Sequence, residues 1–189
     1  MSGTYKNFEE IKENETEGVD FQIETNDIKT PCVVIAIHGG RIEPHTTEIA
    51  RELAGNIFSF YSFQGIKEKN NTIFHVSSST FDEPKCLDLV SKSKKVISIH
   101  GKHELDDFVM LGGLDYSLIK DIEDVLTNGG FKVLESTKNV MGDSPKNICN
   151  KCISGKGVQI EISRGMRERL INDKKELLKF CSVIRECVK

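Results

Sequence analysis

The stretch VVIAIHGGRIEPHTTEIA, residues 33–50, indicates the fold of this chain. Its first five residues form a continuous apolar run rich in β-branched side chains, which is typical of a strand buried on both faces. A histidine, two glycines and Glu43 follow the run. The next segment, TTEIARELAG, places apolar residues at helical spacing and ends at Gly55, which predicts a helix. A buried strand that leads through a polar loop into a helix indicates an α/β fold.

Further elements of both kinds are expected along the chain. The segment KKVISIHG, residues 94–101, predicts a second buried strand, which again ends in histidine and glycine. Strands are also expected at 58–63, 72–79, 131–135 and 155–163. Helices are expected at 46–54, at 84–93, after an Asp115 N-cap, and as one long amphipathic segment from Met166 onward. The alternation predicts a single α/β domain with a mixed, largely parallel central sheet flanked by helices.

The composition excludes some classes of protein but identifies no binding partner. The 189 residues include 26 basic and 29 acidic side chains, for a net charge of −3, which is not the basic excess of a nucleic-acid binder. No apolar stretch approaches the roughly 18 residues of a membrane span. We therefore expect residues 1–18 to be a polar leader and 19–189 to be one domain, cytoplasmic as synthesised, with no signal peptide and no membrane or nucleic-acid partner. The sequence leaves the oligomeric state open, and a monomer is consistent with it.

Six cysteines are spread along the chain. Only Cys149 and Cys152 have the C-x-x-C spacing of metal sites, and the second pair that a structural zinc site requires is missing. A chain of this length does not need disulfides to fold, so we expect reduced cysteines that serve in packing or loops.

Three polar side chains follow the two buried strands. His38 and Glu43 come after the first strand, and His100 ends the second. Ligands bind at the carboxyl ends of strands in open α/β sheets, and two imidazoles with one carboxylate form the ligand set of a catalytic zinc site. Hydrogen-bonded structural histidines would give the same pattern. Glu161, an acid flanked by apolar residues in the predicted strand VQIEIS, is either paired or used in chemistry.

Six motifs together resemble one known family. The segments HGGRIEPHTTEIA, STFDEP, SIHG, LGGLD, NICNKC and GKGVQIEISRGMR occur in the order and spacing of the phage-type poly-γ-glutamate hydrolases. Bacterial relatives in that family are sometimes labelled phage-related replication proteins. The resemblance extends from roughly Thr30 to Arg169.

The resemblance implies a zinc-carboxypeptidase-like fold and hydrolysis of the γ-linked amide bonds of poly-γ-glutamate. It implies that His38, Glu43 and His100 bind one Zn²⁺ per chain and that Glu161 is the general base. The carboxypeptidase pattern spaces its first two ligands as H-x-x-E, whereas two more residues intervene here. The loop between the ligands is therefore expected to be rebuilt.

A polymer with one carboxylate per residue requires a locally positive groove on a chain of net charge −3. Arg164 and Arg167 are the first candidates for this contact, and Arg41 and Lys151 are the second. Arginines at the start of a helix are also common on solvated faces.

Two residues depart from the family pattern. His45 stands where a glycine is expected. Lys151 stands where an arginine is more usual, and a lysine cannot make the planar bidentate contact with a carboxylate that an arginine makes. His103 is expected at the rim of the site, and His75 is expected to be a hydrogen-bonded histidine within a strand.

Two other functions remain open at this point. The same residues would serve a zinc amidase or deacylase that acts on a small acyl-amino acid or a peptide. The family label also suggests a DNA-associated replication factor, which the charge balance disfavours. A catalytically inactive binding domain is disfavoured because His38, Glu43, His100 and Glu161 are all present. An enzyme without a signal peptide would reach an extracellular polymer after release by lysis.

Overall fold

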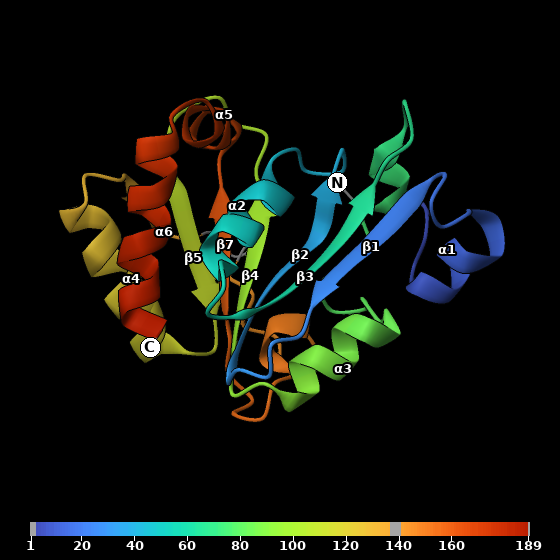
Figure 1. Ribbon diagram of the computed structural model, residues 1–189, viewed down its shortest axis with the longest axis horizontal. Helices are drawn as coiled ribbons and strands as arrows, with labels where there is room; N and C mark the ends of the chain where they lie inside the picture. The colour runs from blue at the N-terminus through green and yellow to red at the C-terminus, as the bar shows by residue number, and fades with distance from the viewer. Residues whose placement is uncertain (1–2, 137–140, 189) are drawn as a thin grey trace.

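The computed structural model describes residues 3–136 and 141–188, and it forms a single α/β domain around a mixed sheet (Figure 1). The strands are β1 (Phe21–Asn26), β2 (Cys32–Gly40), β3 (Ser59–Gly65), β4 (Lys95–Gly101), β5 (Val109–Gly113), β6 (Val133–Leu134) and β7 (Val158–Ile162). The helices are α1 (Phe8–Asn14), α2 (Thr46–Ala54), α3 (Pro84–Lys92), α4 (Tyr116–Asn128), α5 (Arg164–Asn172) and α6 (Lys174–Val188), with short 3₁₀ helices η1 (Asn71–Phe74) and η3 (Ile148–Asn150).

The strand order is β1-β3-β2-β4-β7-β5-β6, and the centre of the sheet is parallel. Neighbours among β3, β2, β4 and β7 pair in parallel, whereas β1 is antiparallel to β3 and β5 is antiparallel to β7. The prediction of a mixed, largely parallel sheet is confirmed. Because β2, β4 and β7 run in the same direction, their carboxyl ends lie at one edge of the sheet.

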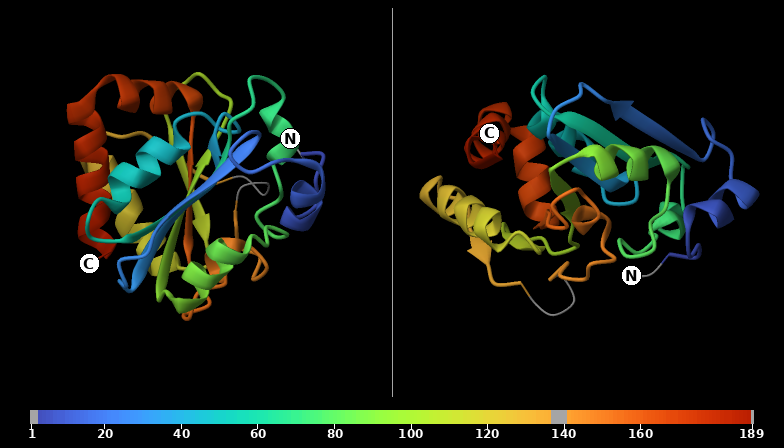
Figure 2. Two further views of the ribbon diagram at one scale, coloured as in Figure 1. Left: turned by 45° about the vertical axis from the view of Figure 1, so that its right-hand side comes forward. Right: turned by 90° about the horizontal axis from the view of Figure 1, so that it is seen from below.

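Four helices cover one face of the sheet. The main core lies between this face and α2, α4, α5 and α6, and α4 and α6 run side by side in Figures 1 and 2. Inward-facing residues such as Val34, Ile99 and Ile160 pack against helix residues such as Leu53 and Ile184. The opposite face of the same strands is also covered, and this is why both faces of each central strand carry apolar side chains.

The opposite face packs against α1, α3, η1 and η3. Residues 1–18 were expected to be a polar leader, but α1 lies on this face and buries Phe8 and Ile11. The Phe8 ring packs edge-on against Phe21 and Phe63, with centroids 5.9 and 6.1 Å apart. The acidic residues between these two apolar positions remain on the outside of the helix, which explains the polar appearance of the segment.

Two predicted elements are wrong. The segment 72–79 is not a strand: η1 ends at Phe74, and the carbonyls of Ile73 and His75 accept hydrogen bonds from residues 3–5 instead of from a strand neighbour. The long C-terminal helix is two helices, because the Asp173 carboxylate accepts from the backbone N–H groups of Lys175 and Glu176 and so starts α6. The expected strand at 131–135 is reduced to β6, and α1, β1 and β5 were not anticipated.

The cysteines take part in packing. All six are free and five are buried, Cys149 and Cys152 among them. Burial raises the pKa of the Cys149 thiol to about 12, which keeps it protonated and unreactive. Within the described ranges, no helix has the length and apolar character needed to cross a bilayer.

Candidate metal and catalytic site

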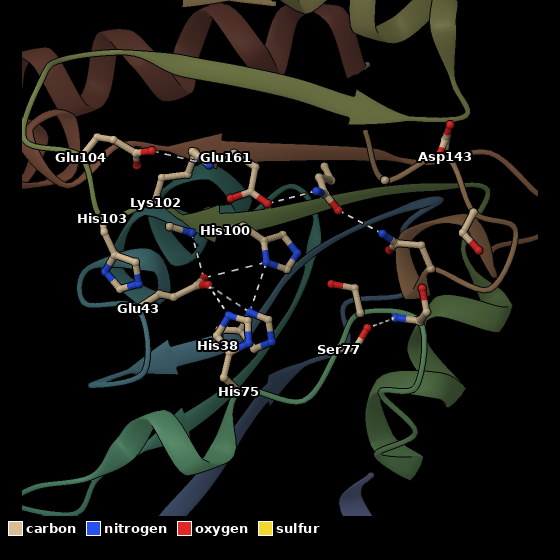
Figure 3. A pocket seen from close by; sticks show the side chains of 17 residues that line it. His38, Glu43, His75, Ser77, His100, Lys102, His103, Glu104, Asp143 and Glu161 are labelled. Atoms are coloured by element: carbon tan, nitrogen blue, oxygen red, sulfur yellow. Dashed lines mark hydrogen bonds and ion pairs between the residues drawn. The ribbon is translucent and has the colours of Figure 1, made fainter. Parts of the chain in front are cut away.

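Side chains from several elements line one pocket at the carboxyl ends of β2, β4 and β7 (Figure 3). These strands contribute His38, His100 and Glu161, respectively. The loop after β2 contributes Glu43, and the segment after η1 contributes His75. The structure therefore brings together the four residues that the sequence assigned to metal binding and base catalysis.

The loop after β2 returns Glu43 to His38. The Glu43 backbone N–H donates to the His38 carbonyl at 2.9 Å, which closes the loop. Gly40 adopts a φ of +63°, and a Cβ at Gly39 would collide with the side chains that face it from α2 and β3. Since neither position accepts an ordinary side chain without strain or a clash, the two glycines make this return possible.

Ring nitrogens of His38 and His100 converge with the Glu43 carboxylate. The His38 Nδ1 atom lies 3.2 Å from Glu43 Oε1 and 3.3 Å from His100 Nδ1. The His100 Nδ1 atom lies 3.8 Å from Glu43 Oε2. All three side chains are buried. Two imidazole nitrogens and a carboxylate at these separations match the donor set of a catalytic zinc site.

The outer nitrogen of each of these two histidines has its own oxygen partner. His38 Nε2 donates to the Val76 carbonyl at 2.8 Å, and His100 Nε2 lies 2.8 Å from Ser98 Oγ. Because a carbonyl can only accept, the neutral His38 ring carries its proton on Nε2 and directs the Nδ1 lone pair at the pocket. Contacts of this kind fix the ring orientation of metal-binding histidines.

The protonation states suit a cation at this point. Burial lowers the pKa of His100 to about 3, so its imidazole is neutral and can act as a ligand. Burial would raise the pKa of Glu43, but the His38 ring beside it holds that pKa well below its ordinary value. Burial also opposes charge on His38, but the Glu43 carboxylate outweighs burial and raises the pKa of His38. The ionised Glu43 carboxylate therefore attracts positive charge to the space beside His38.

His75 is a member of the site that the sequence did not reveal. Its Nε2 lies 3.0 Å from Glu43 Oε1, and its ring stacks on His38 with centroids 3.9 Å apart. His38, Glu43 and His75 also form a group of three that could hold a metal ion. Two possible ligand sets thus share His38 and Glu43, with either His100 or His75 as the third member. His75 follows η1 and lies far from His38, Glu43 and His100 in the chain, so no local sequence motif predicts that it joins them.

Glu161 lies next to His100 in the paired strands β4 and β7. Its carboxylate is partly buried in the pocket, and Gln159 Nε2 donates to Glu161 Oε1 at 3.0 Å. Burial, together with the nearby Glu43 charge, raises the pKa of Glu161 to about 7. A carboxyl group with this pKa can both accept and return a proton near neutral pH.

The guanidinium of Arg167 is buried away from the pocket lining. Its Nε donates to the Pro44 carbonyl at 2.7 Å, and its Nη1 donates to the carbonyls of Lys102, at 3.1 Å, and Ile162. These carbonyls belong to the Glu43 loop and to the ends of β4 and β7. Arg167 therefore connects the three segments that carry the site, a role that its position at the start of a helix did not indicate.

The other predicted cations also lie outside the pocket lining. Arg164 pairs with Glu168 on the surface, Arg41 donates to the Lys67 carbonyl at 3.0 Å, and Lys151 is half-buried at the end of η3. Among the residues that the structure describes, Lys102 is the lysine or arginine in the lining, with His103 beside it at the exposed rim. Lys102 directly follows the strand end, but the sequence offered no reason to prefer it.

His45 lies outside the pocket lining as well. Its φ is 76°, a left-handed conformation that glycine adopts without cost and that strains most other residues. This explains why a glycine is expected there.

Replacing Arg167 by alanine is expected to destabilise the fold by at least about 3 kcal/mol, because three carbonyls lose a charged donor inside the protein. Urea unfolding monitored by circular dichroism measures the change. Arg164→Ala is the matched control, and this exposed ion pair should change stability by less than about 1 kcal/mol. Unaltered stability of Arg167→Ala with a raised KM would instead indicate that Arg167 contacts substrate.

Comparisons with known proteins are consistent across sequence and structure. A family model described as poly-gamma-glutamate hydrolase matches residues 5–179. The UPF0714 protein YndL of Bacillus subtilis (strain 168) is 40% identical over 168 residues, which are 88% of this chain and 66% of YndL. The chain thus spans slightly under two thirds of the length of that relative.

Two solved structures superpose on nearly the whole chain. One, described as "Structure of Bacteriophage poly-gamma-glutamate hydrolase", has a TM-score of 0.93 at 32% identity and covers 98% of this chain and 96% of its own. The other, described as "YNDL-apo (Zinc-free)", has a TM-score of 0.92 at 35% identity and covers 99% and 98%, respectively.

Proposed function

The chain belongs to the poly-gamma-glutamate hydrolase family, and we propose that it is a zinc-dependent hydrolase of the γ-glutamyl amide bonds in poly-γ-glutamate. The observation that carries the zinc dependence is the convergence of His38 Nδ1, His100 Nδ1 and the Glu43 carboxylate, with the outer nitrogens of both rings held by oxygen atoms. The description of a structural relative as zinc-free also supports this choice of metal.

In this proposal His38, Glu43 and His100 bind one zinc ion per chain. When bound, zinc supplies a Lewis acid that lowers the pKa of water to about 7 and polarises an amide carbonyl. His75 donates from Nε2 to Glu43 and keeps that carboxylate directed at the two ligand histidines. The Ser98 hydroxyl and the Val76 carbonyl prevent rotation of the rings.

Glu161 transfers the proton. Its Oε1 accepts from Gln159, so Oε2 is the oxygen available to take a proton from the attacking water. The same oxygen then returns the proton to the nitrogen of the leaving amine when the amide C–N bond breaks. A carboxyl group whose pKa is close to 7 loses little free energy in either direction of this transfer.

The substrate is an anionic polymer, and among the described residues the pocket lining offers it the Lys102 ammonium group. The Lys102 side chain lies in the lining near Glu161 and pairs only loosely with Glu104, with Nζ and Oε1 3.8 Å apart. Lys102 therefore replaces Arg164, Arg167, Arg41 and Lys151 as the first candidate for binding a substrate carboxylate. Rim contacts by Arg164 and Arg41 remain part of the proposal for longer chains.

Metal removal tests the function directly. Dialysis against a chelator is expected to abolish hydrolysis of poly-γ-glutamate, and about one equivalent of zinc per chain should restore it. Chain length followed by gel filtration, together with release of free amines, measures the activity. Activity that persists without metal contradicts the proposal. Cleavage of acylated amino acids in place of the polymer would indicate the amidase alternative.

A further inference from the structure

We propose that Asn147 and Gln159 form a directional hydrogen-bond relay that positions Glu161 for proton transfer. Both are positioning residues, because their contacts lead from the backbone to the Glu161 carboxylate. The inference rests on the proposed function to the extent that Glu161 is the general base. The relay itself is a property of the folded chain.

The relay begins at a backbone group that fixes its direction. Asn147 is the N-cap of η3, and its Oδ1 accepts from the Cys149 backbone N–H at 3.1 Å. Since a backbone N–H can only donate, the Asn147 oxygen must face it and the Asn147 Nδ2 group must point the other way. The Asn147 residue is only 5% exposed, so few solvent contacts compete.

The order of donor and acceptor groups continues from Asn147 through Gln159 to Glu161. Asn147 Nδ2 donates to Gln159 Oε1 at 3.0 Å, which leaves the Gln159 Nε2 group to donate to Glu161 Oε1, also at 3.0 Å. Gln159 and Glu161 lie two residues apart in β7 and therefore on the same face of the sheet. Reversing any one amide would place two donors or two acceptors against each other.

The surroundings hold Gln159 in this position. Gly142 lies so close that a Cβ there would stand 2.8 Å from Gln159 Oε1, and the Gly142 carbonyl is itself held by Asn150 Nδ2 at 2.8 Å. The Gln159 residue is 5% exposed. Gly142 thus lets the loop cover the relay, which restricts rotation of the amide.

A neutral donor suits this role better than a cation. Lys102 and Arg167 already favour the ionised form of Glu161 from a distance, and a lysine or arginine in direct contact with the carboxylate would favour that form more strongly and so weaken it as a base. An amide N–H occupies one carboxylate oxygen without adding charge. The relay therefore orients Glu161 through Oε1, and it lowers the basicity of the carboxylate less than a contacting cation would.

Kinetics of two variants test the relay. Gln159→Leu removes the donor to Glu161. Asn147→Asp keeps the acceptor for Cys149 but offers no donor to Gln159 Oε1, so the Gln159 amide faces a carboxylate at both ends and is no longer held in one orientation toward Glu161. Each variant should lower kcat by about 10- to 100-fold, with KM and zinc content unchanged.

Double variants and a matched control separate positioning from general destabilisation. In a Glu161→Gln background, Gln159→Leu should cause no further loss of kcat, because the two residues act as one unit. Gln64→Leu is the control: Gln64 is also a buried glutamine that donates to a carboxylate, Glu24, at 3.0 Å, but its side chain lies outside the pocket lining. It should keep kcat. Additive losses, or wild-type kcat in Gln159→Leu, would overturn the relay.

A readout that needs no activity completes the test. In ¹⁵N NMR spectra of the metal-free chain, the Gln159 and Asn147 side-chain amide protons should exchange slowly, and Glu161→Leu should shift both sets of signals. Fast exchange at Gln159, like that of an exposed glutamine, contradicts the relay. If the chain cleaves no poly-γ-glutamate, the proposed function fails while this measurement still decides whether the relay exists.

Discussion

Glu161→Gln is expected to lower kcat for γ-glutamyl hydrolysis by about 10²- to 10⁴-fold while zinc content and fold are retained. The amide that replaces the carboxylate has the same shape, and its oxygen can still accept from Gln159 Nε2. It cannot take a proton from water at neutral pH. The loss therefore falls on the chemical step, and KM should change little.

The pH dependence of kcat should change in the same variant. Burial raises the pKa of Glu161 to about 7, and only the ionised carboxylate can act as a base. Activity of the unmodified protein should therefore fall as pH decreases through this region, with the limb displaced to lower pH by a bound cation, which favours the carboxylate. The residual activity of Glu161→Gln should lack this acid limb.

Stopped assays of poly-γ-glutamate chain length, with metal analysis of each preparation, measure these effects. Glu123→Gln is a suitable control, because Glu123 is a surface residue of α4 that pairs with Lys120. Near wild-type kcat in Glu161→Gln would remove Glu161 from the role of general base. Loss of zinc in the same variant would indicate that Glu161 is a ligand instead.

His100→Ala is expected to lose zinc on dialysis and to reduce activity to background, and His38→Ala should behave in the same way. Both side chains direct Nδ1 at the Glu43 carboxylate, so either change leaves two of three protein ligands. His75→Ala should keep the metal, with affinity reduced about 10- to 100-fold, because His75 supports Glu43 in the proposed arrangement.

Zinc titration of each variant by isothermal calorimetry distinguishes the two possible ligand sets. His103→Ala is the control for loss of a histidine at the pocket rim and should bind zinc as the unmodified chain does. If His75→Ala loses zinc and His100→Ala retains it, the ligands are His38, Glu43 and His75.

The central strands could be predicted from sequence because they are covered on both faces. Continuous apolar runs mark β2 and β4, and the alternation around Gln159 and Glu161 marks β7. The edge strand β1 has a mostly polar, exposed pattern and was not anticipated. The segment 72–79 has a strand-like composition but packs against the N-terminal residues, and composition cannot distinguish these outcomes.

The sequence by itself determined that Glu43 follows His38 by a short glycine-containing turn at the end of a buried strand, that His100 ends a second buried strand, and that Glu161 lies within a third strand. These are local facts, and parallel strands bring such ends to one edge of the sheet. Only the tertiary structure decided that His75 joins them, that Asn147 and Gln159 hold Glu161, and that Arg167 is buried while Lys102 lines the pocket. These roles depend on contacts between residues far apart in the chain and on burial, and residue type and spacing encode neither.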